Sequence, residues 1–155
     1  MIKKGDKIGE IILPDSEGNN FQLSSTIGKK VLLTFYRHAS CAICNLRINE
    51  FIKRYDEFGN KFTMVGIFHA PRDFLKKNMK KHKLPFTVLA DEKFEYFKKF
   101  NVEKSYLKLI LAFILKPHKF FLAGLKGYLP VQFKGYLTIV PVAVSYTHLT
   151  LPTTE

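Results

Sequence analysis

The sequence lacks tryptophan, has only two cysteines and contains no long uninterrupted apolar run. Two cysteines cannot hold together a small disulfide-rich protein, and 46% apolar residues exclude a disordered or collagen-like chain. A chain of 155 residues corresponds to one domain with a true core, which its 15 Phe and 7 Tyr can fill. Composition therefore predicts one globular domain, and its function must be sought in particular residues.

Arginine is scarce in a chain whose net charge is +12, because only four of its 25 basic residues are arginine. Proteins that read nucleic acids usually need arginine for bidentate contacts to phosphate or guanine. The lysines are spread from Lys3 to Lys134 without a block of five or more. We therefore expect a lysine-rich solvated surface and no specific nucleic-acid partner. The alternative is an unspecific, salt-sensitive attraction to anionic lipid or nucleic acid.

No targeting or membrane-spanning segment is evident in the sequence. The basic start of the chain is interrupted at once by Pro14, Asp15 and Glu17, unlike a secretory signal peptide. The most apolar window, 107–115, is too short to span a bilayer and contains Lys108. We therefore expect no transmembrane segment and a cytoplasmic location. There, two cysteines separated by two residues indicate catalysis or metal binding rather than a structural disulfide.

The end of the chain differs from the rest, because residues 144–154 carry no charge. This stretch resembles the translation of a transposase-type sequencing adapter; the alternative is a polar, β-like tail. The expected organisation is a domain over residues 1–144, incomplete at its C-terminus, followed by a non-native tail over 145–155.

Hydrophobic periodicity predicts an α/β chain. Residues 11–13 and 21–23 flank a turn-rich linker and indicate a β-hairpin. Residues 31–36 and 62–68 are apolar runs typical of buried strands, and the helical spacing of apolar residues between them predicts a helix over 41–58. Two such strands joined by a helix form a parallel βαβ unit with a right-handed crossover.

The second half of the chain is expected to continue this alternation. A basic helix is expected to begin at Pro71 and run to His82, and a short extended segment follows over 84–89. Asp91 is the expected cap of a helix that continues to Phe100. Beyond it, the pattern predicts a further helix over 107–115 and β-like structure over 128–144.

A redox-active thiol site is predicted at the end of the first buried strand. There, Arg37 and His38 are followed closely by Cys41 and Cys44. A helix N-terminus carries partial positive charge, and it favours a thiolate over a thiol. Arg37 and a protonated His38 would add positive potential there. Cys41 is therefore the expected attacking thiolate, and Cys44 can resolve a mixed disulfide or a sulfenic acid. We expect the Cys41 thiol to be more accessible than the Cys44 thiol.

Two other interpretations of the cysteine pair stay open. Zinc needs four ligands, but there is no second cysteine pair and the five histidines are scattered, so we expect no metal and no bound cofactor. The thiols could also be buried and inert. His38 is either a residue that tunes Cys41 or a neutral histidine satisfied by the backbone. His69, at the end of the second strand, is similarly open to a role in the site.

Several segments together resemble one protein family. They are the opening 5–18, the strand and arginine over 31–37, the Cys41-Ala-Ile-Cys44 helix start, and Leu84-Pro-Phe86 with Asp91. They are similar to the peroxiredoxin-like branch of the alkyl hydroperoxide reductase/thiol-specific antioxidant (AhpC/TSA) family. The resemblance implies a thioredoxin-like α/β fold, a central mixed sheet flanked by helices, here truncated at its C-terminus. It also implies reduction of peroxides or protein disulfides at Cys41, with electrons from a thioredoxin- or glutathione-like thiol donor.

The chain departs from the peroxiredoxin pattern Pro-x-x-x-Thr-x-x-Cys at both thiols. For Cys41 the proline and threonine positions hold Thr34 and His38, and for Cys44 they hold Arg37 and Cys41. Together with a thioredoxin-like proline loop over 138–141 and the absence of the activating Arg that peroxiredoxins usually place near it, this departure favours dithiol–disulfide exchange without excluding peroxide reduction.

Thr138-Ile-Val-Pro141 resembles the loop in which a cis-proline of the thioredoxin fold packs against the dithiol. We therefore expect Pro141 near both sulfurs, after a cis Val140–Pro141 bond. The alternative function is a non-catalytic binding module that holds a partner on an apolar surface over 106–121.

Overall fold

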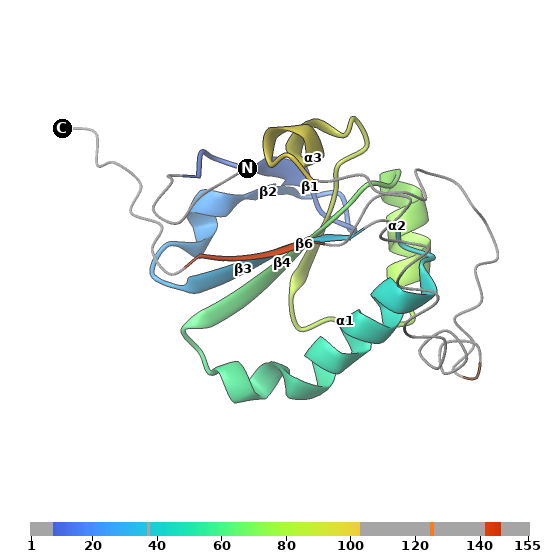
Figure 1. The fold of residues 1–155 in the computed structure, drawn as a ribbon, viewed down its shortest axis with the longest axis horizontal. Coiled ribbons are helices and arrows are strands. Elements are labelled where there is room, and N and C mark those ends of the chain that lie inside the picture. The colour runs from blue at the N-terminus through green and yellow to red at the C-terminus, as the bar shows by residue number, and fades with distance from the viewer. Residues whose placement is uncertain (1–7, 37, 103–124, 126–141, 147–155) are drawn as a thin grey trace.

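The computed structural model describes residues 8–36, 38–102, 125 and 142–146. Its centre is a four-stranded sheet with the order β5-β4-β3-β6 (Figure 1). The strands are β3 (Lys30–Tyr36), β4 (Phe62–Phe68), β5 (Thr87–Ala90) and β6 (Val142–Tyr146). β3, β4 and β5 are parallel and β6 is antiparallel to β3, which confirms the predicted mixed sheet.

β3, α1 (Ala42–Arg54) and β4 form the predicted parallel βαβ unit, with a register from Lys30 opposite Phe62 to Tyr36 opposite Phe68. The helix is shorter than the predicted span, because its last turn tightens into the 3₁₀ helix η2 (Tyr55–Phe58).

Two helices, α1 and α2 (Arg72–Met79), cover one face of the sheet. The core on this face includes Tyr36, Cys44, Ile48, Met64, Phe68, Leu75 and Met79. Gly66 makes room for it, because a Cβ atom there would lie 3.2 Å from Cε2 of Tyr36 and 3.4 Å from Cγ1 of Val88. A glycine in the middle of β4 is thus explained by close packing.

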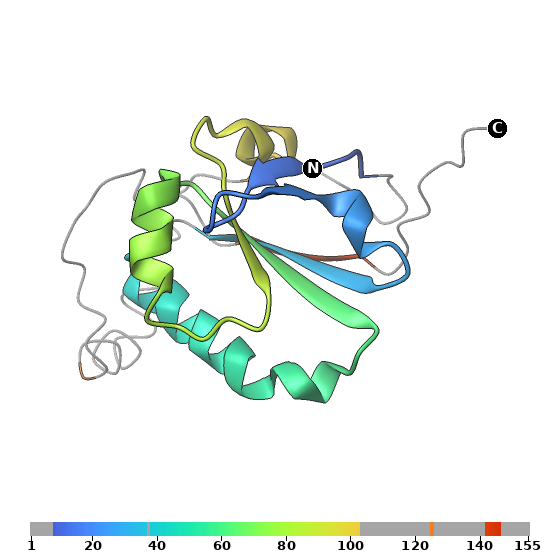
Figure 2. The same ribbon diagram turned by 180° about the vertical axis from the view of Figure 1, so that it is seen from behind.

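The opposite face is covered by the hairpin β1 (Ile12–Pro14) and β2 (Asn20–Gln22), the 3₁₀ helix η1 (Leu23–Thr26) and α3 (Glu95–Lys99) (Figure 2). The hairpin is the predicted one. The core of this layer is aromatic: the ring of Phe35 lies 5.2 Å from that of Phe97 and 5.1 Å from that of Phe100. Alternation along β3 sends Phe35 to this face and Tyr36 to the other.

Asp91 is the cap that the sequence predicts for α3, but the helix itself covers only Glu95–Lys99. The buried carboxylate accepts backbone N–H groups of Glu95 (2.9 Å), Tyr96 (2.8 Å) and Phe97 (3.2 Å). The chain turns at Phe94, whose φ of 61° lies in the left-handed region. This turn delays the start of the helix beyond the position that the cap residue alone predicts.

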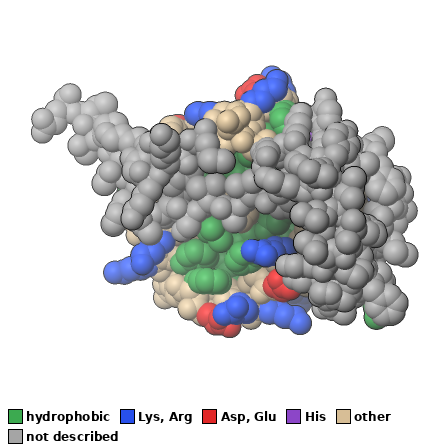
Figure 3. Space-filling model, in the orientation of Figure 1, with side chains coloured by type: hydrophobic (Ala, Val, Ile, Leu, Met, Phe, Trp, Pro, Cys, Tyr) green, Lys and Arg blue, Asp and Glu red, His purple; other side chains and the backbone are tan. Residues whose placement is uncertain are grey.

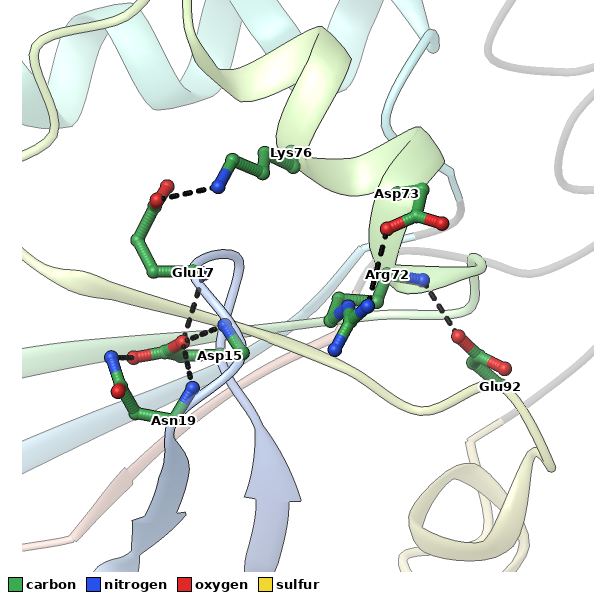
Figure 4. A network of polar contacts seen from close by, with 8 residues as sticks. Asp15, Glu17, Asn19, Arg72, Asp73, Lys76 and Glu92 are labelled. Carbon is green, nitrogen blue, oxygen red and sulfur yellow. Dashed lines mark hydrogen bonds and ion pairs between the residues drawn. The ribbon is translucent and has the colours of Figure 1, made fainter.

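α2 also ends earlier than predicted, and a turn follows in which the His82 N–H donates to the Met79 carbonyl. Polar contacts tie this helix to neighbouring loops (Figure 4). The Arg72 N–H donates to Glu92 Oε1 at 2.7 Å, and Lys76 pairs with Glu17 at 2.8 Å. The first contact joins α2 to the segment before α3, and the second joins α2 to the hairpin turn. Both therefore connect the helices on one face of the sheet to the elements on the other face.

β6 pairs with β3 from Val142 opposite Phe35 to Tyr146 opposite Val31. The strand that the sequence predicts at 142–144 is confirmed, and it continues into the first two residues of the expected tail. The predicted 107–115 helix, the 106–121 surface and most of the β-like 128–144 segment lie outside the described residues.

The surface agrees with the lysine-rich prediction for the part of the chain that the structure describes. All but one of the described lysines are exposed, and the exception, Lys76, is half-buried. Figure 3 shows lysine and arginine side chains around hydrophobic ones on one face. None of the helices described is long and apolar enough to cross a membrane.

Candidate dithiol site

The two cysteines lie at the start of α1, directly beyond the carboxyl end of β3. A tight turn connects these elements, closed by a hydrogen bond of 3.0 Å from the Cys41 N–H to the His38 carbonyl. Cys41 is the N-cap residue of the helix and is partly exposed, whereas Cys44 is only 2% exposed. The predicted difference in accessibility between the two thiols is confirmed.

The position of Cys41 favours its ionised form. The N-terminus of a 13-residue helix carries partial positive charge, which stabilises a nearby thiolate. The first turn of α1 contains no acidic residue that would oppose this effect. Cys44 follows three positions later, the spacing that places two side chains on the same side of a helix. The arrangement suits a reactive outer thiol with a buried second thiol behind it.

Cys44 packs in the core between α1 and the sheet, in the same cluster as Tyr36. The Tyr36 hydroxyl is buried and has no hydrogen-bond partner among the described residues. Burial raises the pKa of Tyr36 to about 12; the neighbouring Thr34 side chain opposes the rise, and the charge of the nearby Cys44 adds to it. Tyr36 therefore stays a neutral phenol throughout the physiological pH range.

His38 is 3% exposed and its Nδ1 lies 3.0 Å from the Ser40 hydroxyl, within the turn that carries Cys41. Its ring also meets Phe74 of α2 edge-on, with centroids 6.1 Å apart. These contacts fix the imidazole in the wall of the site. The predicted supporting residues Arg37 and Pro141 lie outside the described residues.

His69 belongs to the other layer of the molecule. Its Nδ1 lies 3.2 Å from the Asp91 carbonyl, and its ring meets Phe94 edge-on at 4.8 Å. A carbonyl only accepts, so Nδ1 carries the proton in this hydrogen bond. Phe94 and Phe97 belong to the cluster opposite that of Cys44, so His69 lies on the α3 side of the sheet.

Sequence reasoning missed two residues behind the cysteine turn: Asn45, which contacts the turn, and His82, which contacts Asn45. Asn45 is fully buried, and its Nδ2 donates to the carbonyls of Ala39 (2.9 Å) and Cys41 (2.8 Å). Its Oδ1 lies 2.8 Å from Nε2 of His82, which follows α2. One signal was present in the sequence: Asn45 lies four residues after Cys41, on the apolar side of the predicted helix.

Comparisons with known proteins place the chain in a family. Residues 4–123 match the sequence profile of the AhpC/TSA family. The chain belongs to this family. It is 35% identical over 107 residues to a Buchnera aphidicola protein named peroxiredoxin bcp, covering 65% of each chain. It is 29% identical over 109 residues to peroxiredoxin Bcp of Escherichia coli, covering 68% of this chain and 70% of that one.

Solved structures agree on the fold of this AhpC/TSA chain. Peroxidoxin BcpB of Mycobacterium tuberculosis superposes with a TM-score of 0.63 at 26% identity, covering 69% of this chain and 71% of that one. A Chlorobium tepidum structure described as a thiol:disulfide interchange protein DsbE superposes with a TM-score of 0.56 at 23% identity. The match covers 67% of this chain and 74% of that one. The chain spans 65% of the Buchnera protein and half of peroxiredoxin Q from Sedum lineare. The thioredoxin-like fold that the sequence predicts is confirmed.

Proposed function

We propose that this AhpC/TSA-family chain is a thiol-dependent oxidoreductase that reduces peroxides at Cys41 and uses Cys44 as the resolving thiol. The observation that carries the proposal is the contrast between the two sulfurs. Cys41 is partly exposed at the N-terminus of α1, and Cys44 is buried one turn further along. The names of the curated relatives from Buchnera, Sedum lineare and Escherichia coli, each a peroxiredoxin, support a peroxide as the substrate.

The reaction balances with one peroxide and two external thiols. The Cys41 thiolate attacks one peroxide oxygen, the O–O bond breaks, and the alkoxide or hydroxide takes a proton, which leaves Cys41 as a sulfenic acid. Cys44 then attacks the Cys41 sulfur, forming a disulfide and releasing water. Two thiols of a donor reduce this disulfide by exchange, and the donor leaves as its own disulfide.

Reduction of protein disulfides is the second substrate class for the same dithiol. A CxxC pair with an accessible first thiol suits exchange, because Cys41 can form the mixed disulfide and Cys44 can release it. The departure from the peroxiredoxin pattern also favours exchange. Where that pattern needs proline and threonine, this chain has Thr34 and His38 before Cys41, or Arg37 and Cys41 before Cys44. We expect the electron donor to be a thioredoxin- or glutathione-like thiol in either case.

Arg37, His38 and Pro141 complete the proposed site as supporting residues. His38 lies in the turn that holds Cys41, and Arg37 precedes it in the sequence. β6 begins at Val142, opposite Phe35 near the end of β3 that leads to the dithiol. This register supports a position for the preceding proline near the sulfurs. The cis geometry of the Val140–Pro141 bond stays a prediction.

The test is a thiol-coupled assay of the reduced chain with hydrogen peroxide and, separately, with insulin disulfides. We expect turnover with at least one substrate, none for Cys41→Ser, and a single turnover with trapped mixed disulfides for Cys44→Ser. The ratio of the two activities assigns the substrate class. Equal activity of Cys41→Ser and the natural sequence would refute the proposal.

A further inference from the structure

Asn45 uses its whole side-chain amide to connect the cysteine turn to the segment after α2. Both of its Nδ2 hydrogens are engaged, one by the Ala39 carbonyl and one by the Cys41 carbonyl. The Cys41 carbonyl also accepts the Asn45 backbone N–H at 2.9 Å, so it is held twice by the same residue. The two carbonyls flank the stretch of backbone that places the Cys41 thiol.

The orientation of this amide is fixed by its partners. If Oδ1 and Nδ2 were exchanged, an oxygen would face two carbonyl oxygens, which cannot donate. Oδ1 therefore points to His82, and Nε2 of His82 must donate to it at 2.8 Å. Burial lowers the pKa of His82, and the neighbouring Lys81 adds to this, so the ring is neutral near pH 7 with its proton on Nε2.

The contact joins two elements that are 37 residues apart in the sequence. Figures 1 and 2 both show the beginning of α1 beside α2, from opposite sides. Asn45 is fully buried and His82 is 9% exposed, so water cannot readily replace either partner.

Building on the proposed function, we propose that Asn45 and His82 are a positioning pair that holds the Cys41 turn in its reactive geometry. His82 acts through Asn45, and Asn45 acts through the backbone of Ala39 and Cys41. Without the His82 donor, Oδ1 of Asn45 is a buried acceptor with no proton, and the amide can recover a donor only by turning away from its two Nδ2 hydrogen bonds. If these bonds are lost, the Ala39 carbonyl loses its Asn45 donor and the Cys41 carbonyl keeps only the Asn45 backbone N–H, so more partial negative charge opposes a thiolate at Cys41.

The test measures the alkylation rate of Cys41 against pH in the full chain carrying Cys44→Ser, so that only one thiol reacts. His82→Leu removes the donor, and we expect it to raise the apparent pKa of Cys41 by about one unit, which slows alkylation at pH 7 by up to about tenfold. His82→Gln restores an N–H donor and is expected to recover the parent rate to within about twofold.

Two further variants separate positioning from loss of stability. Asn45→Ser shortens the side chain so that it cannot span from His82 to the turn, and we expect the same slowing. Asn78→Ala is the matched control, because Asn78 Nδ2 donates to the Phe74 carbonyl at 2.8 Å on the same layer but does not reach the cysteine turn. It is expected to leave the Cys41 profile unchanged. Thermal unfolding of each variant identifies any that do not fold.

The inference is overturned if folded His82→Leu or Asn45→Ser keeps the parent profile, or if His82→Gln is as slow as His82→Leu. A parent chain whose Cys41 titrates like an ordinary cysteine would instead refute the proposed function, and the inference with it. The two failures are distinguished because the first leaves a reactive parent thiol and the second does not.

Discussion

The rings of Tyr36 and Phe68 stack with their centroids 4.8 Å apart and their planes 18° from parallel. These residues end β3 and β4 at the same level of the sheet, beside the buried Cys44. The stack places the Tyr36 hydroxyl in the core without a partner among the described residues. Such a hydroxyl costs folding free energy, because it loses water and gains no well-formed hydrogen bond in return, only the proximity of the Thr34 side chain.

Tyr36→Phe is therefore expected to leave the free energy of unfolding at pH 7 unchanged or raise it by up to about 1 kcal/mol. At alkaline pH the two chains should diverge. The pKa of Tyr36 is about 12 in the folded chain against 10.0 ordinarily, so unfolding releases a proton in this range and the free energy of unfolding falls as the pH rises from 10 toward 12. The natural chain should lose about 2 to 3 kcal/mol more than Tyr36→Phe over that range. Urea unfolding at a series of pH values measures this, and identical pH profiles would contradict it.

Gly66→Ala is expected to destabilise the fold by about 1 to 3 kcal/mol, because its Cβ would lie 3.2 Å from the Tyr36 ring. The strand conformation itself accepts alanine, so the cost arises from packing. The double variant Tyr36→Leu with Gly66→Ala should recover part of the loss. Additive effects of the two substitutions in urea unfolding would show that the two sites do not interact.

Asp91→Ala is expected to cost about 2 kcal/mol or more, because three backbone N–H groups at the start of α3 lose their acceptor. Asp91→Asn keeps one acceptor oxygen and should cost less. Hydrogen exchange of the Tyr96 and Phe97 amides should accelerate in the alanine variant. Unchanged protection of these amides would contradict the role given to the carboxylate.

Asp15 stabilises the hairpin turn in a pH-dependent way (Figure 4). Burial alone would raise its pKa, but hydrogen bonds from Asn19, Glu17 and Gly18 together outweigh that effect and lower the pKa below its ordinary 3.8. The stabilisation is therefore present above pH 4 and is lost as the pH falls through the lowered pKa. We expect Asp15→Asn to be less stable at pH 7, with a difference that shrinks in acid. A difference independent of pH would refute this.

The order of elements and the dithiol could be predicted because each depends on local signals. Each signal concerns structure within a few residues of itself. The signals are the apolar runs of β3 and β4, the helical spacing between them and the carboxylate of Asp91. The same locality explains the errors at helix ends. The left-handed turn at Phe94 and the 3₁₀ turn after Arg54 depend on packing against the sheet, which the sequence pattern does not show.

The Asn45–His82 contact could not be predicted for a different reason. Its partners are 37 residues apart, and only the docking of α2 beside α1 brings them together. Asn45 carried a signal as a polar residue on an apolar stripe, whereas nothing near His82 in the sequence distinguishes it from a surface residue among lysines. His69 was open to a role in the site from its place after β4, but its ring contacts place it on the α3 face, opposite the cluster of Cys44.

The most direct test of the central claim is to trap the oxidised sulfur. Cys44→Ser and Cys41→Ser, each with a single thiol, are treated with one equivalent of hydrogen peroxide in the presence of dimedone, which forms a thioether with sulfenic acids. Intact mass measurement then shows which chain gains the adduct. We predict an adduct on Cys41 in Cys44→Ser and little or none on Cys44 in Cys41→Ser. The opposite pattern, with Cys44 labelled and Cys41 unlabelled, would contradict the assignment of Cys41 as the attacking thiol.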